Sequence, residues 1–263
     1  MVVYAGQGDP RRSIELLWRR SGEDDKRPGP KPGLSVDAIV DAGIAVADEL
    51  GMAALSMRAV GERLGRTAMA LYTYVPGKNE LVDLMYDRSM AELPASYDLT
   101  GGWRAAATRW AHDMWEFYAR HAWVLQVSQA RPVLGPHEFV VFESLASILV
   151  TTGLPGRELR GIVGALNYFV RGAAQTIAEA RAAGGATGEA DEEWWYARSA
   201  VLVEIEPDLE KKFPMLHLLE RDREPVDPEL PYLENDAVEN FQNGLRVLLD
   251  GVEGAVADRA SRS

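Results

Sequence analysis

The chain of 263 residues contains no cysteine. It can therefore form neither a disulfide nor a metal site built on thiolates. Long apolar runs are also missing, since the longest one, around residues 140–150, is interrupted by Glu143 and is too short to cross a bilayer. Residues 1–20 lack the apolar core and the cleavage site of a secretory signal. These absences lead us to expect a cytoplasmic protein.

Patterns typical of strands and of catalysis are missing as well. No segment alternates convincingly between apolar and polar residues, and no glycine-rich phosphate loop, nucleotide fingerprint, Ser/His/Asp arrangement or carboxylate pair stands out. We expect neither enzyme activity nor a cofactor. Of the four histidines, His112 shares a helix face with Glu116, and the two side chains can together hold a divalent ion. A structural or surface role is favoured for each histidine, so no metal site is predicted.

Charge is distributed unevenly along the chain. The formal net charge is −12, which argues against a general nucleic-acid binder. Residues 1–92 contain 12 basic and 14 acidic residues, so most of the negative charge lies in the remainder. Between Ser56 and Lys78, four basic residues accompany a single acidic one. An acidic body with a locally basic segment suits a protein that meets phosphate with one end only.

Apolar residues recur at helical spacing from Ser35 onward, and the protein is predicted to be all-α. Ser35 is a good N-cap, and glycines end the first two helices. The predicted helices near the N-terminus cover about residues 35–51, 56–65, 67–74 and 79–93. Later helices are predicted at about 103–121, 139–149, 157–183, 194–205 and 235–250, with a loop at Gly184–Gly188 and an irregular stretch from Pro207 to Pro231.

The segment Leu55–Leu81 has the pattern of a DNA-binding helix-turn-helix. A short amphipathic helix is followed by a tight turn at Gly65–Arg66 and by a second short helix with small, hydroxylic or aromatic outward residues. In such a motif the first helix braces the second, whose N-terminal residues enter the major groove. Gly65 suits the turn because it has no Cβ, and Leu64 and Leu71 are expected to pack inward. An ordinary helical hairpin in a bundle is the less favoured interpretation.

The same segment closely resembles the DNA-binding domain of the TetR (tetracycline-repressor) family. The resemblance covers about Leu34–Ala91 and rests on Leu64–Gly65, Leu71–Val75 and Lys78–Leu81. It implies that Ser56 caps its helix, that Lys78 grips phosphate, and that the start of the second helix faces the groove. The residues implied in DNA binding are Ser56, Arg58, Arg66, Thr67, Ala68, Met69, Ala70, Tyr72, Thr73, Tyr74 and Lys78.

The C-terminal part resembles the tetracycline-repressor branch more loosely, through the segments Arg120–Val124 and Phe241–Gly251. The family resemblance implies a homodimer, a palindromic DNA operator and a small-molecule effector. Small residues of the 157–183 helix and the apolar stripe Val238–Leu249 can form the dimer interface, or they can be intramolecular core. A cavity for a flat, mostly apolar ligand requires large aromatics with few polar groups. The candidate ligand-binding residues are Trp110, Met114, Phe117, Phe142, Leu145, Asn167, Tyr168 and Arg171.

The predicted organisation is a flexible N-terminal arm (1–33), a three-helix helix-turn-helix domain (34–92) and a larger helical bundle for effector binding and dimerisation (93–263). Lys26, Arg27 and Lys31 of the arm can enter the minor groove, although a solubilising tail is slightly favoured. The predicted function is sequence-specific transcriptional regulation, with a repressor released from its operator by its ligand. The alternatives are an activator, a helical ligand-binding or scaffolding protein without DNA function and, more distantly, a helical enzyme.

Overall fold

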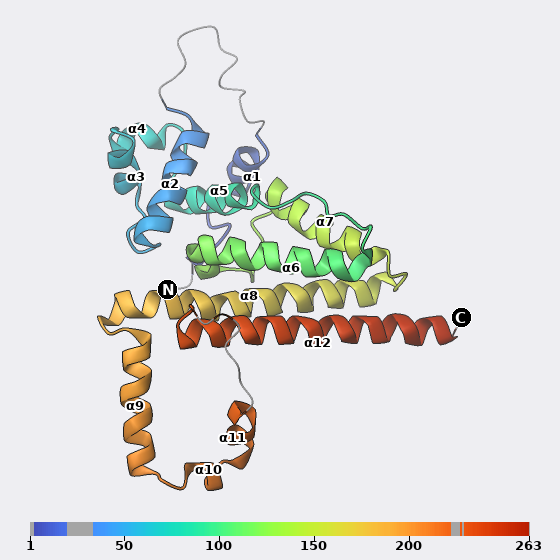
Figure 1. Cartoon of the computed structure of the whole chain (residues 1–263). Coiled ribbons are helices and arrows are strands. Elements are labelled where there is room, and N and C mark those ends of the chain that lie inside the picture. The colour runs from blue at the N-terminus through green and yellow to red at the C-terminus, as the bar shows by residue number, and fades with distance from the viewer. Residues whose placement is uncertain (1–2, 20–33, 222–226, 228, 263) are drawn as a thin grey trace. The chain divides into compact units, whose positions relative to one another are not determined.

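A computed structural model describes residues 3–19, 34–221, 227 and 229–262 (Figure 1). The structure is 74% helical, which confirms the all-α prediction. The chain divides into two compact units, residues 1–164 and 165–263, and each is described by itself.

In unit 1 the predicted helices are all present. Ser35 begins the first of them by accepting a hydrogen bond from the Ala38 N–H at 3.1 Å, and Gly51 ends it with a φ of 76°. The elements of unit 1 are β1 (Val3–Tyr4), α1 (Pro10–Leu17), α2 (Val36–Leu50), α3 (Met57–Arg63), α4 (Ala68–Tyr72), α5 (Lys78–Met90), α6 (Gly102–Arg120), the 3-10 helix η2 (Ala122–Gln126), β2 (Val127–Ser128), α7 (Pro136–Val150) and the start of α8 (Gly156–Thr187).

Helix α5 is the centre of unit 1. Nine of its 13 residues are buried, including Asp83 and Asp87. It packs against α1, α2 and α7, while α2, α3 and α4 gather near its first residues (Figure 1). Because neighbours cover α5 on several sides, its sequence lacks the clear polar face of a surface helix.

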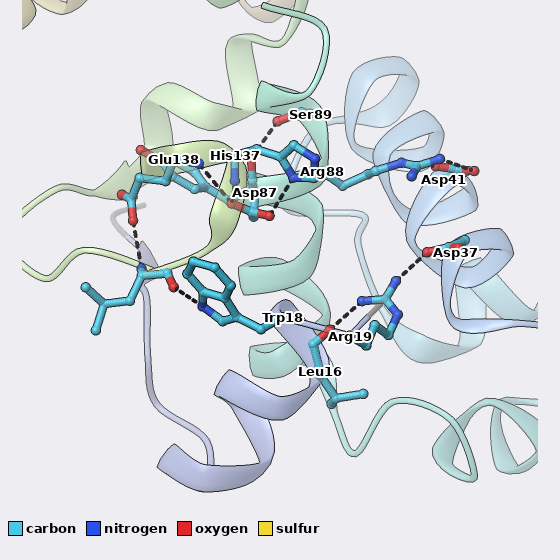
Figure 2. A network of polar contacts seen from close by, with 12 residues as sticks. Leu16, Trp18, Arg19, Asp37, Asp41, Asp87, Arg88, Ser89, His137 and Glu138 are labelled. Carbon is cyan, nitrogen blue, oxygen red and sulfur yellow. Dashed lines mark hydrogen bonds and ion pairs between the residues drawn. The ribbon is translucent and has the colours of Figure 1, made fainter. Parts of the chain in front are cut away.

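The carboxylate of Asp87 caps the N-terminus of α7. It accepts hydrogen bonds from the backbone N–H groups of His137 and Glu138 at 2.9 and 3.0 Å, and its second oxygen lies 2.8 Å from His137 Nδ1 (Figure 2). Gly135, at the N-cap position of α7, offers no side chain for this purpose. A Cβ at Gly135 would lie 2.1 Å from an Asp87 oxygen. A residue of α5 therefore supplies the cap that α7 lacks.

A second polar contact joins α2 to the turn after α6. Buried His121 places Nδ1 2.8 Å from an Asp48 oxygen and Nε2 3.2 Å from a Glu92 oxygen. The indole N–H of Trp123 donates to the same Asp48 oxygen at 2.8 Å. The segment Arg120–Val124 thus connects α2 with the residues that follow α5, and His121 has the structural role that was favoured for it.

The N-terminal residues differ from the flexible arm that we expected. Residues 3–19 are packed: Ala5 and Leu17 are buried, and β1 pairs in parallel with β2, with Val3 opposite Val127. Residues Pro10–Leu17 of this segment form the helix α1. Two-residue strands are too short to show an alternating pattern, so the sequence did not predict them. Lys26, Arg27 and Lys31 lie outside the described residues.

Unit 2 is built on the remainder of α8 and on α12, which lie side by side (Figure 1). Phe169 stacks on Phe241 at 6.0 Å between ring centroids, and Arg181 pairs with Glu234 at 2.9 Å. The elements after α8 are α9 (Asp191–Ile205), α10 (Leu209–Lys212), α11 (Pro214–Arg221) and α12 (Tyr232–Arg262).

Three predicted boundaries in unit 2 are wrong. The loop expected at Gly184–Gly188 is helical as far as Thr187, and Gly188 ends the helix with a φ of 76°. Each helical glycine costs only about 1 kcal/mol relative to alanine, which a long packed helix tolerates. The stretch Pro207–Pro231 contains α10 and α11, because Pro207 lies ahead of α10 and Pro214 is the first residue of α11. Helix α12 extends beyond the expected end at Asp250.

Asp83 provides a test of the packing around α5. Burial raises the pKa of Asp83 to about 6, against the opposing effect of the hydrogen bond from the Gly6 N–H. The reference pKa is 3.8. At a pH between these two values, Asp83 therefore keeps its proton in the folded protein and has lost it in the unfolded chain. The protonated Asp83 carboxyl therefore makes its whole contribution to the free energy of unfolding at a pH below the reference pKa. This contribution is lost as the pH rises through the pKa of Asp83 in the folded protein.

We expect Asp83→Asn to be more stable than the parent protein at pH 8, since the amide keeps an acceptor for Gly6 without a buried charge. The advantage should shrink as pH falls through the folded pKa of Asp83. Urea unfolding of both proteins at pH 8 and pH 5 measures it. A variant less stable than the parent at pH 8 would contradict this account.

Candidate nucleic-acid interface

Two short capped helices form the motif predicted between Leu55 and Leu81. Ser56 Oγ accepts from the Ala59 N–H at 3.1 Å to begin α3, and Thr67 Oγ1 accepts from the Ala70 N–H at 3.4 Å to begin α4. The turn between them uses Gly65 in the left-handed region, with a φ of 63°. Leu71 is fully buried as predicted, whereas Leu64 is only half-buried. The helix-turn-helix is thus held by its own caps, its turn and buried apolar side chains, among them Val60 on α3 and Leu71 on α4.

Gly61 is a structural residue of the turn that sequence reasoning missed. Its carbonyl accepts a hydrogen bond from the Arg66 N–H at 2.8 Å, which draws α3 close to the turn. A Cβ at Gly61 would lie 2.8 Å from the Arg66 carbonyl oxygen. Gly61 has an ordinary helical backbone conformation, so the sequence around it does not indicate this role. The role arises because the backbone of the turn at Arg66 folds back against Gly61.

The structure brings the predicted DNA-binding residues together on α3, α4 and the start of α5. Met69 is 75% exposed and Tyr72 is 42% exposed, so both side chains are accessible to a partner. Arg58, Arg66, Thr67, Thr73 and Lys78 are also exposed, while Ser56, Ala68, Ala70 and Tyr74 are half-buried.

The four basic residues of this segment differ in their partners. Arg58 pairs with Glu62 at 2.8 Å, and Arg63 makes two hydrogen bonds of 2.7 Å to Glu49 on α2. Arg66 and Lys78 have no ion-pair partner among the described residues. These two cations are therefore available to an external anion without breaking an existing pair.

Lys78 is the first residue of α5. The preceding Gly77 makes no side-chain cap, so N–H groups at this helix start are left without an internal acceptor. A helix N-terminus with free N–H groups and an exposed lysine has the chemistry to hold a phosphate.

The candidate effector residues fall into both units. In unit 1, Trp110, Met114, Phe117 and Leu145 are buried, whereas Phe142 is 39% exposed. The Trp110 indole N–H is buried and has no hydrogen-bond partner among the described residues. In unit 2, Asn167 is buried, Arg171 is half-buried and Tyr168 is 70% exposed.

A different set of residues lines a cleft of about 450 Å³ in unit 1. Six of its nine lining residues are polar or charged, and none is a predicted effector residue; the lining consists of Asp41, Ile44, Ala45, Asp48, Arg88, Ser89, Ala91, Glu92 and His121.

Within the described ranges, no three His, Asp or Glu side chains lie together in a way that could hold a metal ion. His112 and Glu116 thus have no third ligand of that kind there. None of the helices in the described part of the chain is both long and apolar enough to cross a membrane.

Comparison with known families agrees with this architecture. Residues 39–85 match the model of bacterial regulatory proteins of the tetR family, and residues 95–256 match the tetracyclin repressor-like C-terminal domain. The chain belongs to the TetR family. The predicted family and its tetracycline-repressor branch are therefore confirmed, and TetR proteins are transcriptional regulators rather than enzymes as a group.

Relatives of this TetR protein carry regulatory names. The chain is 37% identical over 262 residues to the HTH-type transcriptional repressor DrrR1 of Streptomyces coeruleorubidus, covering 98% of this chain and 91% of that one. It is 26% identical over 156 residues to an HTH-type transcriptional regulator of Saccharopolyspora erythraea, covering 59% of this chain and 65% of that one.

Solved structures share the fold. Apo ActR from Streptomyces coelicolor superposes with a TM-score of 0.68 at 22% identity, covering 88% of this chain and all of that one. ActR in complex with actinorhodin gives a TM-score of 0.66 at 22% identity, covering 84% of this chain and 96% of that one.

The Gly61 contact provides a test of the motif. We expect Gly61→Ala to destabilise the helix-turn-helix by about 1–3 kcal/mol, since the methyl group must push the Arg66 carbonyl away. Thermal unfolding of the full chain measures the effect. Ala59→Gly, on the same helix, is the matched control, with a cost of about 1 kcal/mol from helix propensity alone. A Gly61→Ala protein as stable as the parent would show that the turn can relax.

Proposed function

We propose that this TetR protein is a homodimeric repressor that binds a palindromic operator and leaves it when a small, mostly apolar molecule binds. The observation that carries the proposal is the exposed start of α4 beside Arg66 and Lys78, two cations that have no ion-pair partner in the part of the chain that the structure describes. Residues 34–92 form the DNA-binding part and residues 93–263 the effector-binding and dimerisation part.

In this proposal α4 is the recognition helix. Thr67, Thr73 and Tyr74 provide hydroxyl groups for backbone and base edges, and Tyr72 presents its exposed ring. Met69 and Ala70 lack side-chain hydrogen-bond donors, so thymine methyl groups are their natural partners in the major groove. Ser56 lies at the start of α3, where its hydroxyl can reach a phosphate.

The ion pairs predict how much each basic residue contributes to DNA binding. We expect Lys78→Ala and Arg66→Ala each to weaken binding to the operator and to lower the salt slope by about 1, because each removes one phosphate contact. Arg63→Ala should change affinity much less, since that guanidinium is already bound to Glu49. Fluorescence anisotropy with DNA from upstream of the protein's own gene, at several salt concentrations, measures both quantities.

The matched control is Arg109→Ala, which removes the same charge from an exposed residue of α6. If Lys78→Ala behaves like this control, the phosphate assignment is wrong. If the parent protein binds no duplex at low salt, the proposed function itself fails, and the alternative of a helical ligand-binding protein without DNA function takes its place.

The exposed apolar surface of unit 2 supports a homodimer. Helices α9, α10 and α11 contain no buried residue. Twelve large apolar side chains between Trp194 and Leu219 are 37% to 76% exposed. With about 150–250 Å² for an aromatic side chain, they expose on the order of 1,000 Å². That exceeds the largest patch of a typical monomer, about 300–600 Å², and matches the roughly 800 Å² per partner of a stable interface.

Two-fold symmetry of such a dimer suits a palindromic operator, whose half-sites lie about 34–36 Å apart, one helical turn. The mass of the complex with a mapped operator, measured by light scattering, tests the stoichiometry of two chains per duplex. A bacterial regulator of this kind meets its DNA in the cytoplasm, where we place the protein.

The buried N–H of Trp110, which has no acceptor within the described ranges, supports an effector site in the helical body. A buried donor without an acceptor costs about 1–3 kcal/mol, which a ligand oxygen can recover. Met114, Phe117 and Leu145 are buried apolar residues of the same unit, as a flat aromatic ligand requires. Phe142 and Tyr168 are too exposed to support an enclosed site by themselves.

We take a polycyclic aromatic compound with carbonyl oxygens as the effector class and actinorhodin as the probe. Trp110→Phe keeps an aromatic ring but removes the donor. We expect it to require about fivefold more actinorhodin for release from DNA, the effect of one hydrogen bond. Its thermal stability should be equal to or above that of the parent. Failure of actinorhodin to release the parent protein would contradict this class, and an unchanged response of the variant would contradict the role of Trp110.

A further inference from the structure

Residues 3–19 lie ahead of the segment that matches the family's DNA-binding model, yet they contact four other elements of unit 1. The Gly6 N–H donates to both Asp83 oxygens on α5 at 3.1 Å, and α1 packs against the same helix. Strand β1 pairs with β2, which follows α6 and η2. We name residues 3–19 the brace.

The end of the brace joins α2 of the helix-turn-helix domain to the segment that begins α7 (Figure 2). Arg19 forms an ion pair with Asp37 in the first turn of α2, and both side chains are largely buried, at 24% and 30% exposure. The neighbouring Trp18 donates its indole N–H to the Leu134 carbonyl at 2.9 Å, and its ring centroid lies 6.0 Å from that of Phe139 on α7.

Leu134 adopts a backbone conformation that needs support. Its φ of 65° is the only positive value of a non-glycine residue in the described chain. Such a conformation costs a side-chain-bearing residue about 1–2 kcal/mol. The Leu134 N–H is held by a Glu138 oxygen at 2.7 Å, and its carbonyl is held by Trp18. The contact of Trp18 with this carbonyl is thus part of what fixes the loop before α7.

We propose that Trp18 and Arg19 are positioning residues, which fix the orientation of the helix-turn-helix domain on the helical body. Helix α5 is the covalent connection between the two, and the brace is a non-covalent connection in addition to it and to the contact of Asp48 with His121. The inference rests on the proposed function as an operator-binding dimer.

The consequence is specific to DNA with two half-sites. A dimer must present two recognition helices at a set separation, so freedom in their orientation has to be lost on binding. A loosened brace increases that freedom and weakens binding to a full operator. Binding to one half-site needs no set separation and should hardly change.

The test uses the full chain with duplexes from its own upstream DNA, after footprinting has defined the operator and a half-site. We expect Arg19→Ala, Asp37→Ala and Trp18→Ala each to weaken binding to the full operator by about threefold to tenfold. Binding to the half-site should change by less than about twofold. In the double variant Arg19→Ala/Asp37→Ala the losses should not add, because both substitutions remove one contact. Arg19→Lys should restore part of the affinity.

Two controls separate positioning from charge and from folding. Arg11→Ala removes the same charge from α1, but its partner Glu15 lies on that helix, so operator affinity should stay near that of the parent. Asp37→Ala removes a negative charge, for which simple electrostatics predicts tighter binding and the brace predicts weaker binding. Thermal unfolding identifies any variant that is globally destabilised, and Trp18→Phe, which removes the hydrogen bond but keeps an aromatic ring, then replaces Trp18→Ala.

The proposal is overturned if the parent protein binds the operator while Arg19→Ala and Trp18→Phe bind it equally well. Tighter binding by Asp37→Ala, or equal losses on full operator and half-site, would also overturn it. A parent protein that binds neither duplex points instead to failure of the proposed function.

Discussion

The rest of unit 1 depends on buried carboxylates of one helix, α5, that accept backbone hydrogen bonds from its neighbours. Asp87 caps α7, and Asp83 accepts from the N–H of Gly6. A buried carboxylate is costly unless donors surround it, so the two aspartates favour one arrangement of the three segments. Since α5 directly follows α4, this arrangement also determines where the helix-turn-helix ends relative to the helices that pack on α5.

Local and tertiary contacts have different roles in the candidate DNA-binding surface. Ser56, Thr67 and Gly65 define where α3 and α4 begin and how the turn between them closes, and these are interactions within a few residues. The availability of Arg66 and Lys78 depends on which carboxylates lie nearby in the fold. Arg63 is bound to Glu49 on another helix, so its charge is partly neutralised although its side chain remains exposed.

Coupling between an effector and DNA requires two arrangements that differ in their contacts. The contacts that join the DNA-binding helices to the body are specific: Asp48 with His121 and Trp123, Asp87 with α7, and the ion pair of Arg19 with Asp37. Each is polar and short in range, so a small displacement of the helix that carries it would break it. Polar contacts of this kind distinguish two positions of a helix more sharply than apolar packing does.

By itself the sequence determined the helical class, the helices of unit 1 and the position of the DNA-binding motif, because caps, glycine turns and apolar spacing act over a few residues. Helix ends in unit 2 were harder to predict, since α8 continues through Gly184 and Gly185, residues that favour a loop when the sequence is considered alone. Only the tertiary structure decided that residues 3–19 are packed, that Gly61 faces the Arg66 carbonyl, and which arginines are paired. These contacts form between residues that are distant in sequence, or between residues that a turn of the backbone brings together. A pattern of neighbouring residues in the sequence does not show which of them will be close in space.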